Sequence, residues 1–301
     1  MPSLSSPPVR TEYGRAVLSV ELIEDFREQG FVVVPDLLDD RELDQYREAV
    51  TRAVQTRTAG DERSLDEKSR YQQSFQQCMN LWEDFEDVRP LTFHPRLGHA
   101  AAELLGVDAV RLWHDQALYK QAGGRATDPH QDHPYWPIKE TASVTAWIPF
   151  DGSTLESGAM AYLPRTHTIG LRKFVNIFFG EPENILTDPE VAGIEPVYVE
   201  VPKGSVAFHH GLTIHLANPN RSARDRAVHT IIYFPDGSTR GYPHPHFCVD
   251  RGGIEVGQKI DSDATPIAWP RPDGDLPRPP ATPIAVPAGI ANLGAVPTPR
   301  S

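Results

Sequence analysis

The sequence predicts a mainly β domain, a sandwich or barrel of short strands, with helices packed in front of it. From about residue 111 onward, runs of β-branched and aromatic residues alternate with turns rich in Gly, Pro and Asp. Before residue 107, apolar residues recur at helical spacing. The second half lacks the regular strand–helix alternation of a parallel α/β sheet, which excludes that class. A chain of 301 residues, of which 39% are hydrophobic, can bury the core that such a domain needs.

The N-terminal half contains three helical segments with recognisable ends. The first is expected at residues 19–30, where a serine begins the segment and a glycine ends it. A β-branched run at residues 31–35 then predicts a short buried strand. Asp39 and Glu42 form a capping-box pattern at the start of a second helix. Residues 95–106 predict a further helix, with Pro near its start and Gly at its end.

The remainder divides into a strand-rich core and two loose ends. Residues 1–17 are expected to be a loose segment, residues 18–262 a single domain, and residues 263–301 a Pro-rich extended tail. Within the domain, the helical part covers about residues 18–106 and the β core about residues 107–250. A long connection at residues 170–195 is too long for a hairpin turn and predicts a lid or binding loop. The expected strands lie within residues 111–120, 142–150, 158–164, 197–210 and 227–234.

Composition limits the classes of partner. No run approaches the about 18 to 20 apolar residues of a membrane span, and the first residues lack the pattern of a secretory signal. Cys78 and Cys248 are too few for a disulfide framework and are expected to be reduced thiols. A net charge of -12 argues against nucleic acid or anionic membrane as a partner. These features favour a cytoplasmic protein that acts on a small molecule.

The segment DPHQDHPYWP carries the most informative motif. On an extended strand His130 and Asp132 would point to the same side, about 7 Å apart at the backbone. An imidazole and a carboxylate so placed can take adjacent positions on one metal ion. A second histidine from a distant strand would complete a 2-His-1-carboxylate triad, which leaves three positions open on Fe(II). The motif by itself is common, so its weight depends on the rest of the chain.

Three histidines compete for the third ligand position: His209, His210 and His215. We favour His215, because it lies in an apolar, β-branched run and Arg226 follows it by eleven residues. Neighbouring antiparallel strands would bring His215 and Arg226 to opposite ends of one cavity. There the guanidinium could bind the far carboxylate of a dicarboxylate whose other end chelates the metal. Strand or turn roles are favoured for His209 and His210.

Taken together, these features resemble the phytanoyl-CoA dioxygenase family. The resemblance rests on H-Q-D-x-x-Y-W-P, on the late His with Arg eleven residues on, and on the opening helix–G-F-V-V-V-P–helix. It covers about residues 18–240. The resemblance implies a double-stranded β-helix (a cupin-like jelly roll) with flanking helices, Fe(II) as cofactor, and 2-oxoglutarate and O2 as co-substrates.

The resemblance also assigns residues. A carboxylate at Asp132 implies oxygenation, because halogenating relatives have a small residue there. Two positions depart from the family pattern: Thr166 replaces a serine, and Ala217 stands where many relatives have a hydroxyl that helps to hold the co-substrate. The implied iron ligands are His130, Asp132 and His215, and the implied co-substrate contacts are Arg226, Gln116 and Trp147.

The expected reaction is hydroxylation of an unactivated C–H bond of a small organic substrate, with release of succinate and CO2. Desaturation, epoxidation or cyclisation would use the same site, and a secondary-metabolite intermediate is the favoured substrate. Alternatives are an acyl-CoA or other acyl substrate, a non-redox cupin-type binding module, and a metal-dependent hydrolase or isomerase. The sequence has no clear basic cluster for coenzyme A phosphates. Candidate substrate contacts are His133, Tyr135, Trp136, Gln73, Phe75 and Met79.

Overall fold

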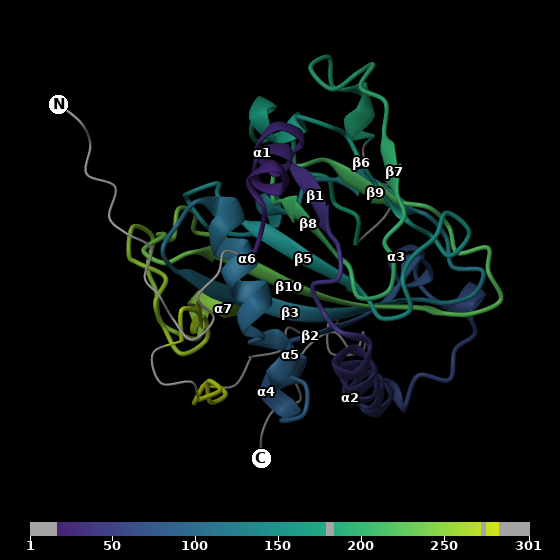
Figure 1. The fold of residues 1–301 in the computed structure, drawn as a ribbon, viewed down its shortest axis with the longest axis horizontal. Coiled ribbons are helices and arrows are strands. Elements are labelled where there is room, and N and C mark those ends of the chain that lie inside the picture. The colour runs from purple at the N-terminus through teal and green to yellow at the C-terminus, as the bar shows by residue number, and fades with distance from the viewer. Residues whose placement is uncertain (1–16, 179–183, 272–274, 283–301) are drawn as a thin grey trace.

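Two antiparallel β-sheets pack against each other, and helices cover the outer face of the larger one (Figure 1). This computed structural model describes residues 17–178, 184–271 and 275–282. The predicted jelly roll with N-terminal helices is confirmed. The expected loose segment at residues 1–17 lies almost entirely outside the described residues.

All strand pairings within the two sheets are antiparallel. The larger sheet has the order β1 (Phe31–Val34), β8 (Val206–His210), β5 (Val144–Pro149), β10 (Arg226–Pro235), β3 (Val110–Lys120) and β11 (Ile267–Trp269), and β2 (Gln76–Met79) also pairs with β3. The smaller sheet has the order β4 (Thr127–His130), β9 (His215–Ala217), β6 (Met160–Tyr162) and β7 (Val197–Val199).

Strand β10 explains why the larger sheet is apolar on both faces. Successive side chains of a strand point to opposite faces. Ile231 and Tyr233 lie in the main core beneath the helices. Val228 lies between the two sheets, in contact with the cluster that contains Trp147 and Met160. The inner face of this strand therefore belongs to the space between the sheets, where Arg226 also begins the strand.

The three predicted helices are present where the sequence places them. Ser19 caps α1 (Val20–Gln29), and Gly30 ends it in the left-handed region at φ 83. Asp39 and Glu42 form the expected capping box of α2, with both bonds at 2.9 Å. The long helix α6 lies across the outer face of the larger sheet (Figure 1). The helices besides α1 are α2 (Asp40–Thr58), α3 (Arg70–Ser74), α4 (Leu81–Asp84), α5 (Arg89–Thr92), α6 (Pro95–Leu105) and α7 (Phe247–Asp250).

The described structure continues past residue 262, the expected end of the domain. Strand β11 follows it and pairs with β3 at Arg111 and Val110. Ala268, in the middle of β11, is buried, and β11 packs closely on α6: a Cβ at Gly98 would lie 3.0 Å from Cβ of Trp269 and 3.2 Å from the carbonyl oxygen of Ala268. The run is only three residues long, too short for a periodic signal among prolines. Residues 272–274 and 283–301 of the expected tail lie outside the described residues.

In the described residues of the 170–195 connection, the regular structure is a short turn of 3-10 helix at Ile185–Thr187. Its apolar residues Val175 and Ile177 are buried in a cluster with Tyr71 and Phe75. Residues 179–183 are outside the described part, and the lid role stays a prediction. No helix in the described ranges is both long and apolar enough to cross a membrane.

Candidate functional site

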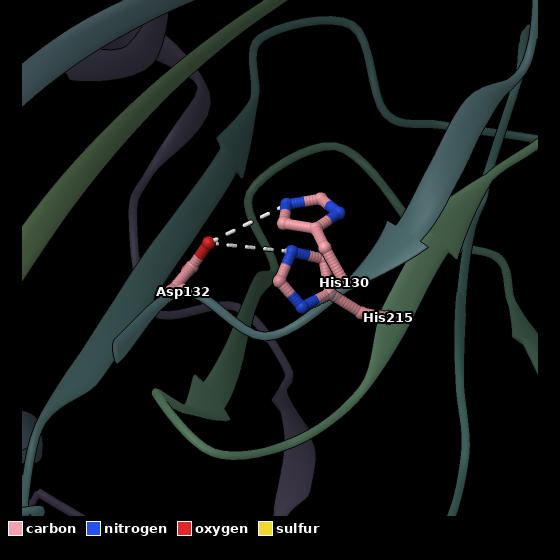
Figure 2. A group of neighbouring side chains, drawn as sticks. All are labelled: His130, Asp132 and His215. Carbon is pink, nitrogen blue, oxygen red and sulfur yellow. Dashed lines mark ion pairs between the residues drawn. The ribbon is translucent and has the colours of Figure 1, made fainter. Parts of the chain in front are cut away.

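His130, Asp132 and His215 come together as one group at the edge of the smaller sheet (Figure 2). Each offers one ligand atom, and these atoms all lie within 4.8 Å of one another. The Nε2 atoms of both histidines lie 3.6 Å from the same oxygen, Oδ1 of Asp132. Two imidazole nitrogens and one carboxylate oxygen that converge in this way can hold a divalent metal ion.

Strand pairing places the two histidines. His130 is the last residue of β4 and lies directly opposite His215, the first residue of β9. Asp132 does not continue the strand, contrary to the sequence expectation. Its backbone is helical (φ -77, ψ -43), because the chain enters a 3-10 turn that contains Pro134. The turn, and not strand alternation, brings the carboxylate to the imidazoles.

Backbone carbonyls fix the orientation of both rings. His130 Nδ1 donates to the carbonyl of Asp128 at 2.8 Å, and His215 Nδ1 donates to the carbonyl of Thr213 at 3.0 Å. In neutral imidazoles this leaves each Nε2 without a proton and able to bind a metal. Burial lowers the pKa of His215 to about 3, which keeps its ring neutral at neutral pH.

Asp132 is held on its other side by two side chains that the sequence analysis missed. Oδ2 accepts hydrogen bonds from Thr145 Oγ1 at 3.1 Å and from His209 Nε2 at 3.2 Å. Burial opposes ionisation of Asp132, but the histidines around it, His215 first, outweigh burial and hold its pKa well below the usual range.

The sequence contained a signal for His209. In β8, alternate side chains face opposite ways, and His209 shares its face with Ala207, which packs between the sheets. His210 faces outward instead, with its ring 6.4 Å from that of Phe26 and 5.5 Å from that of His167. The expected strand role therefore describes His210, whereas His209 contacts the carboxylate of the site.

Arg226 and Trp147 lie together between the sheets. The guanidinium carbon of Arg226 is 5.0 Å from the centre of the Trp147 ring, and Nη1 donates to the carbonyl of Gly158. Burial lowers the pKa of Arg226 to about 9, so the side chain is still charged at neutral pH. Two buried polar atoms here have no hydrogen-bond partner: Nε of Arg226 and the hydroxyl of Tyr162.

His215 and Arg226 lie on different sheets, so the expectation that they stand on neighbouring strands is wrong. β9 belongs to the smaller sheet and β10 to the larger one. The turn between them crosses from one sheet to the other, held by the side chain of Asn220, which donates to the carbonyls of Lys120 and Arg224. Packing between the sheets, and not strand pairing, brings the two residues to one interior.

Gln116 lies on β3, opposite Thr230 of β10 and Met79 of β2. Its side-chain oxygen accepts a hydrogen bond from Gln77, whose own oxygen accepts from the hydroxyl of Tyr71 at 2.7 Å. Gln77 and Tyr71 were not among the predicted site residues. They connect Gln116 to helix α3.

Three of the candidate substrate contacts have partners inside the protein. The ring nitrogens of His133 lie 3.3 Å from Ser143 Oγ and 3.2 Å from the carbonyl of Ile138. Trp136 is buried in a cluster around Trp113. Gln73 donates to the carbonyl of Lys68 at 2.9 Å. These contacts favour structural roles for His133, Trp136 and Gln73.

Tyr135 and Phe75 lie in a chain of aromatic rings that begins at the metal ligands. The Tyr135 ring is 6.1 Å from that of His130 and 5.3 Å from that of Phe178. The ring of Tyr71 is 4.6 Å from Phe178 and 5.0 Å from Phe75. The Tyr135 hydroxyl donates to the carbonyl of Val175 at 2.5 Å, which ties the turn after Asp132 to the 170–195 connection.

Comparison with known proteins agrees with this geometry. Residues 26–228, more than half of the chain, match the phytanoyl-CoA dioxygenase (PhyH) family. The chain belongs to this family. The family expected from the sequence is thereby confirmed, and with it the enzyme class: non-haem iron dioxygenases that use 2-oxoglutarate.

Individual relatives differ in their stated activities. A phytanoyl-CoA dioxygenase domain-containing protein 1 homolog of Caenorhabditis elegans is 22% identical over 262 residues, which cover 70% of this chain and 89% of the relative. A probable alpha-ketoglutarate-dependent hypophosphite dioxygenase of Stutzerimonas stutzeri is 28% identical over 153 residues, covering 50% and 53%. The structure of this chain is similar to the crystal structure of SnoK, a non-heme alpha-ketoglutarate dependent carbocyclase from nogalamycin biosynthesis. The two superpose with a TM-score of 0.70 at 26% sequence identity, over 83% of this chain and 96% of SnoK.

The residues present suit both groups that the family uses. Two neutral imidazoles and a carboxylate form the donor set of mononuclear Fe(II) sites. The unpartnered Nε of the buried Arg226 and the unpartnered hydroxyl of Tyr162 are donors that a carboxylate would satisfy.

Proposed function

We propose that this protein oxidises a C–H bond of a small, partly apolar organic substrate, with Fe(II) bound by His130, Asp132 and His215. The convergence of these three ligand atoms within 4.8 Å carries the proposal. When bound, the iron would supply the oxidising chemistry, with 2-oxoglutarate converted to succinate and CO2. The protein binds and orients both compounds and excludes water.

Arg226 is assigned to the far carboxylate of 2-oxoglutarate. Its guanidinium is buried, and the contact with the Trp147 ring and the hydrogen bond to the Gly158 carbonyl hold its orientation. Its free Nε supports a charge-assisted bond to a carboxylate. The Tyr162 hydroxyl supports a second one, and it would compensate for the hydroxyl that Ala217 lacks.

The substrate is proposed to enter past the aromatic chain formed by Tyr71, Phe75, Tyr135, Phe174 and Phe178. This chain runs from the ring of His130 to Phe174, which is 48% exposed, with Tyr135 and Phe174 5.0 Å apart. Aromatic walls favour flat or ring-containing apolar molecules. The likeness to SnoK supports a natural-product intermediate, and the net charge of -12 does not favour the phosphates of coenzyme A.

The iron and co-substrate assignments are tested together by anaerobic titration. Purified protein with Fe(II) and 2-oxoglutarate should develop a weak visible charge-transfer band. Asp132→Ala should abolish the band and succinate release, because it removes one of three ligands. A band of normal intensity in Asp132→Ala would show that the ligand set is wrong.

The substrate class is tested by a screen for compounds that raise the rate of succinate release above the rate measured without any substrate. The arms are aromatic polyketide intermediates, fatty acyl-CoA thioesters and small phosphorus oxyanions. We expect release with the first arm. Release with the second or third arm alone would overturn the proposed substrate class and leave the iron site intact.

A further inference from the structure

We propose that His209 and Thr145 are positioning residues that hold Asp132 so that only one of its oxygens can reach the metal. The proposal rests on the function proposed above, because it concerns the same carboxylate. It assigns a role to two side chains that are not among the proposed iron ligands or co-substrate contacts.

The two oxygens of Asp132 have separate partners. Oδ1 faces the metal position, at 3.6 Å from the Nε2 atoms of both His130 and His215 (Figure 2). Oδ2 accepts from Thr145 Oγ1 at 3.1 Å and from His209 Nε2 at 3.2 Å. Two donors on one oxygen fix the rotation of the carboxylate about its side-chain bond.

Strand register explains why these two side chains act together. Thr145 of β5 and His209 of β8 are direct cross-strand partners. Both are buried, with exposed fractions of 3% and 2%. Asp132 itself lies in a turn beyond the end of β4, so the ladder does not fix its side chain. The larger sheet thus positions Asp132, a metal ligand that lies in the turn after strand β4 of the smaller sheet.

His209 is close to the metal ligands without being one. Its ring lies 4.5 Å from that of His215, yet its nitrogens are not within the mutual 4.8 Å that unites the three ligands. The Nε2 proton that bonds Oδ2 also prevents this nitrogen from binding a cation. Its other nitrogen, Nδ1, is buried without a hydrogen-bond partner.

The consequence concerns the number of open positions on the metal. Three protein ligand atoms leave three positions, which a bidentate co-substrate and O2 require. A carboxylate that rotated to bind through both oxygens would take one of these three. His209 and Thr145 occupy Oδ2 and thereby preserve the position.

The experiment measures metal binding by the metal-free protein, without turnover. Mn2+ affinity is obtained by calorimetry for the parent, Thr145→Val, His209→Phe and the double variant. We expect each change to weaken Mn2+ binding about 10- to 100-fold, as loss of a partner of a metal ligand does. Visible absorption of the Co2+-loaded variants should change in band position and intensity, because the carboxylate can then rotate.

Two matched controls separate positioning from general damage. Thr145→Ser keeps the donating hydroxyl and should bind Mn2+ and Co2+ as the parent does. His210→Asn changes the adjacent histidine of the same strand, which faces the other way, and should also keep parental metal binding. If His209→Phe fails to fold, Thr145→Val, which preserves side-chain volume, still decides the question.

Suppose that Asp132→Ala loses metal binding, but Thr145→Val and the double variant keep parental Mn2+ affinity and an unchanged Co2+ spectrum. The positioning role would then be wrong, and the proposed ligand set would stand. If Asp132→Ala binds Mn2+ as the parent does, both the ligand set and this inference are wrong. Weaker binding in Thr145→Val with retention in Thr145→Ser supports the positioning role.

Discussion

Arg226 is a buried cation without an acidic partner among the described residues. Its Nε has no hydrogen bond, and burial lowers its pKa to about 9. A buried charge that lacks compensation raises the free energy of the ligand-free protein. A dianionic ligand that reaches this position relieves that cost, which gives the site a preference for a carboxylate over a neutral group.

Replacing Arg226 with Lys should therefore keep the charge and lose the Nε donor of the guanidinium. We expect the KM for 2-oxoglutarate to rise by on the order of 100-fold, because a buried charged pair loses about 3 kcal/mol when its geometry is broken. Succinate formation at varied 2-oxoglutarate measures the effect. Arg224→Lys, in the exposed turn just before the strand, is the control and should leave this KM unchanged.

Tyr162→Phe tests the second unpartnered donor. The ring is retained, including its stacking on Phe31 at 4.5 Å, and only the hydroxyl is lost. We expect the KM for 2-oxoglutarate to rise about tenfold, the effect of one hydrogen bond to a charged group. An unchanged KM would mean that the hydroxyl points away from the co-substrate.

Lys120 gives the molecule a pH dependence that has a definite sign. This side chain is fully buried opposite Arg226, and burial, then Arg226 and Arg125, lower its pKa to about 6. The pKa of Lys120 is about 10.5 in the unfolded chain. Between pH 6 and pH 10.5 the unfolded chain therefore binds more protons than the folded protein. The contribution to the free energy of unfolding therefore rises with pH, by up to about 1.4 kcal/mol per unit.

Urea unfolding at pH 6.5 and 8.5 measures this contribution against Lys120→Met, which has no group to titrate. The parent should gain about 2.5 kcal/mol relative to the variant between the two pH values. A constant difference would show that Lys120 keeps its proton in the folded protein.

At the scale of elements, the turn before β6 brings the two sheets into contact. Gly158 has φ +92, and a Cβ there would lie 2.8 Å from the carbonyl oxygen of Asn218 and 2.9 Å from Cδ of Lys120. Its own carbonyl accepts a hydrogen bond from Arg226. Only glycine combines this backbone conformation with this close approach.

Gly158→Ala should lower the free energy of unfolding by more than the about 1 kcal/mol that a positive φ alone costs, and it should weaken 2-oxoglutarate binding by displacing Arg226. Gly193→Ala is the matched control, because Gly193 has φ +90 and a Cβ there would meet no heavy atom within 4 Å among the described residues. Equal stability losses in the two variants would show that the contacts at Gly158 relax without cost.

The sequence was most informative where a local rule decides an element. Capping residues, a proline and terminal glycines marked the positions of α1, α2 and α6, and β-branched and aromatic runs between turns located β3, β5, β6, β7, β8 and β10 but not β2 or β11. The three predicted iron ligands do come together. Local rules could not place Asp132 in a turn, and they could not assign His215 and Arg226 to separate sheets, because those facts depend on how the sheets pack. The same limit hid the role of Thr145 and left His209 with an expected strand or turn role, because Asp132, their partner, is distant in sequence.

At the scale of the whole molecule, the C-terminal part of the described chain is fastened to the helices by one buried ion pair. Both side chains of Glu83 and Arg251 are only 4% exposed, and their two bonds measure 2.6 and 2.8 Å. Glu83 belongs to α4, and Arg251 follows α7 directly. The pair joins segments that are 168 residues apart.

Arg251→Met should lower the free energy of unfolding by about 3 to 5 kcal/mol, because it breaks the ion pair of a buried carboxylate. Glu83→Leu combined with Arg251→Met should recover most of that loss, since no charge then stays buried. Chemical denaturation of both variants measures the difference. A double variant as unstable as Arg251→Met alone would show that packing, and not the uncompensated charge, dominates.

The assignment of the iron ligands to one sheet and of Arg226 to the other has a mechanical meaning. With one end chelated by the metal and the other bound by Arg226, 2-oxoglutarate would link the two sheets. The sheets could then separate only after the ligand had left, so its binding energy would resist unfolding. At a concentration 100 times its Kd this adds about 2.7 kcal/mol. The space between the sheets, where the reaction would take place, would also be the part of the molecule that bound 2-oxoglutarate stabilises.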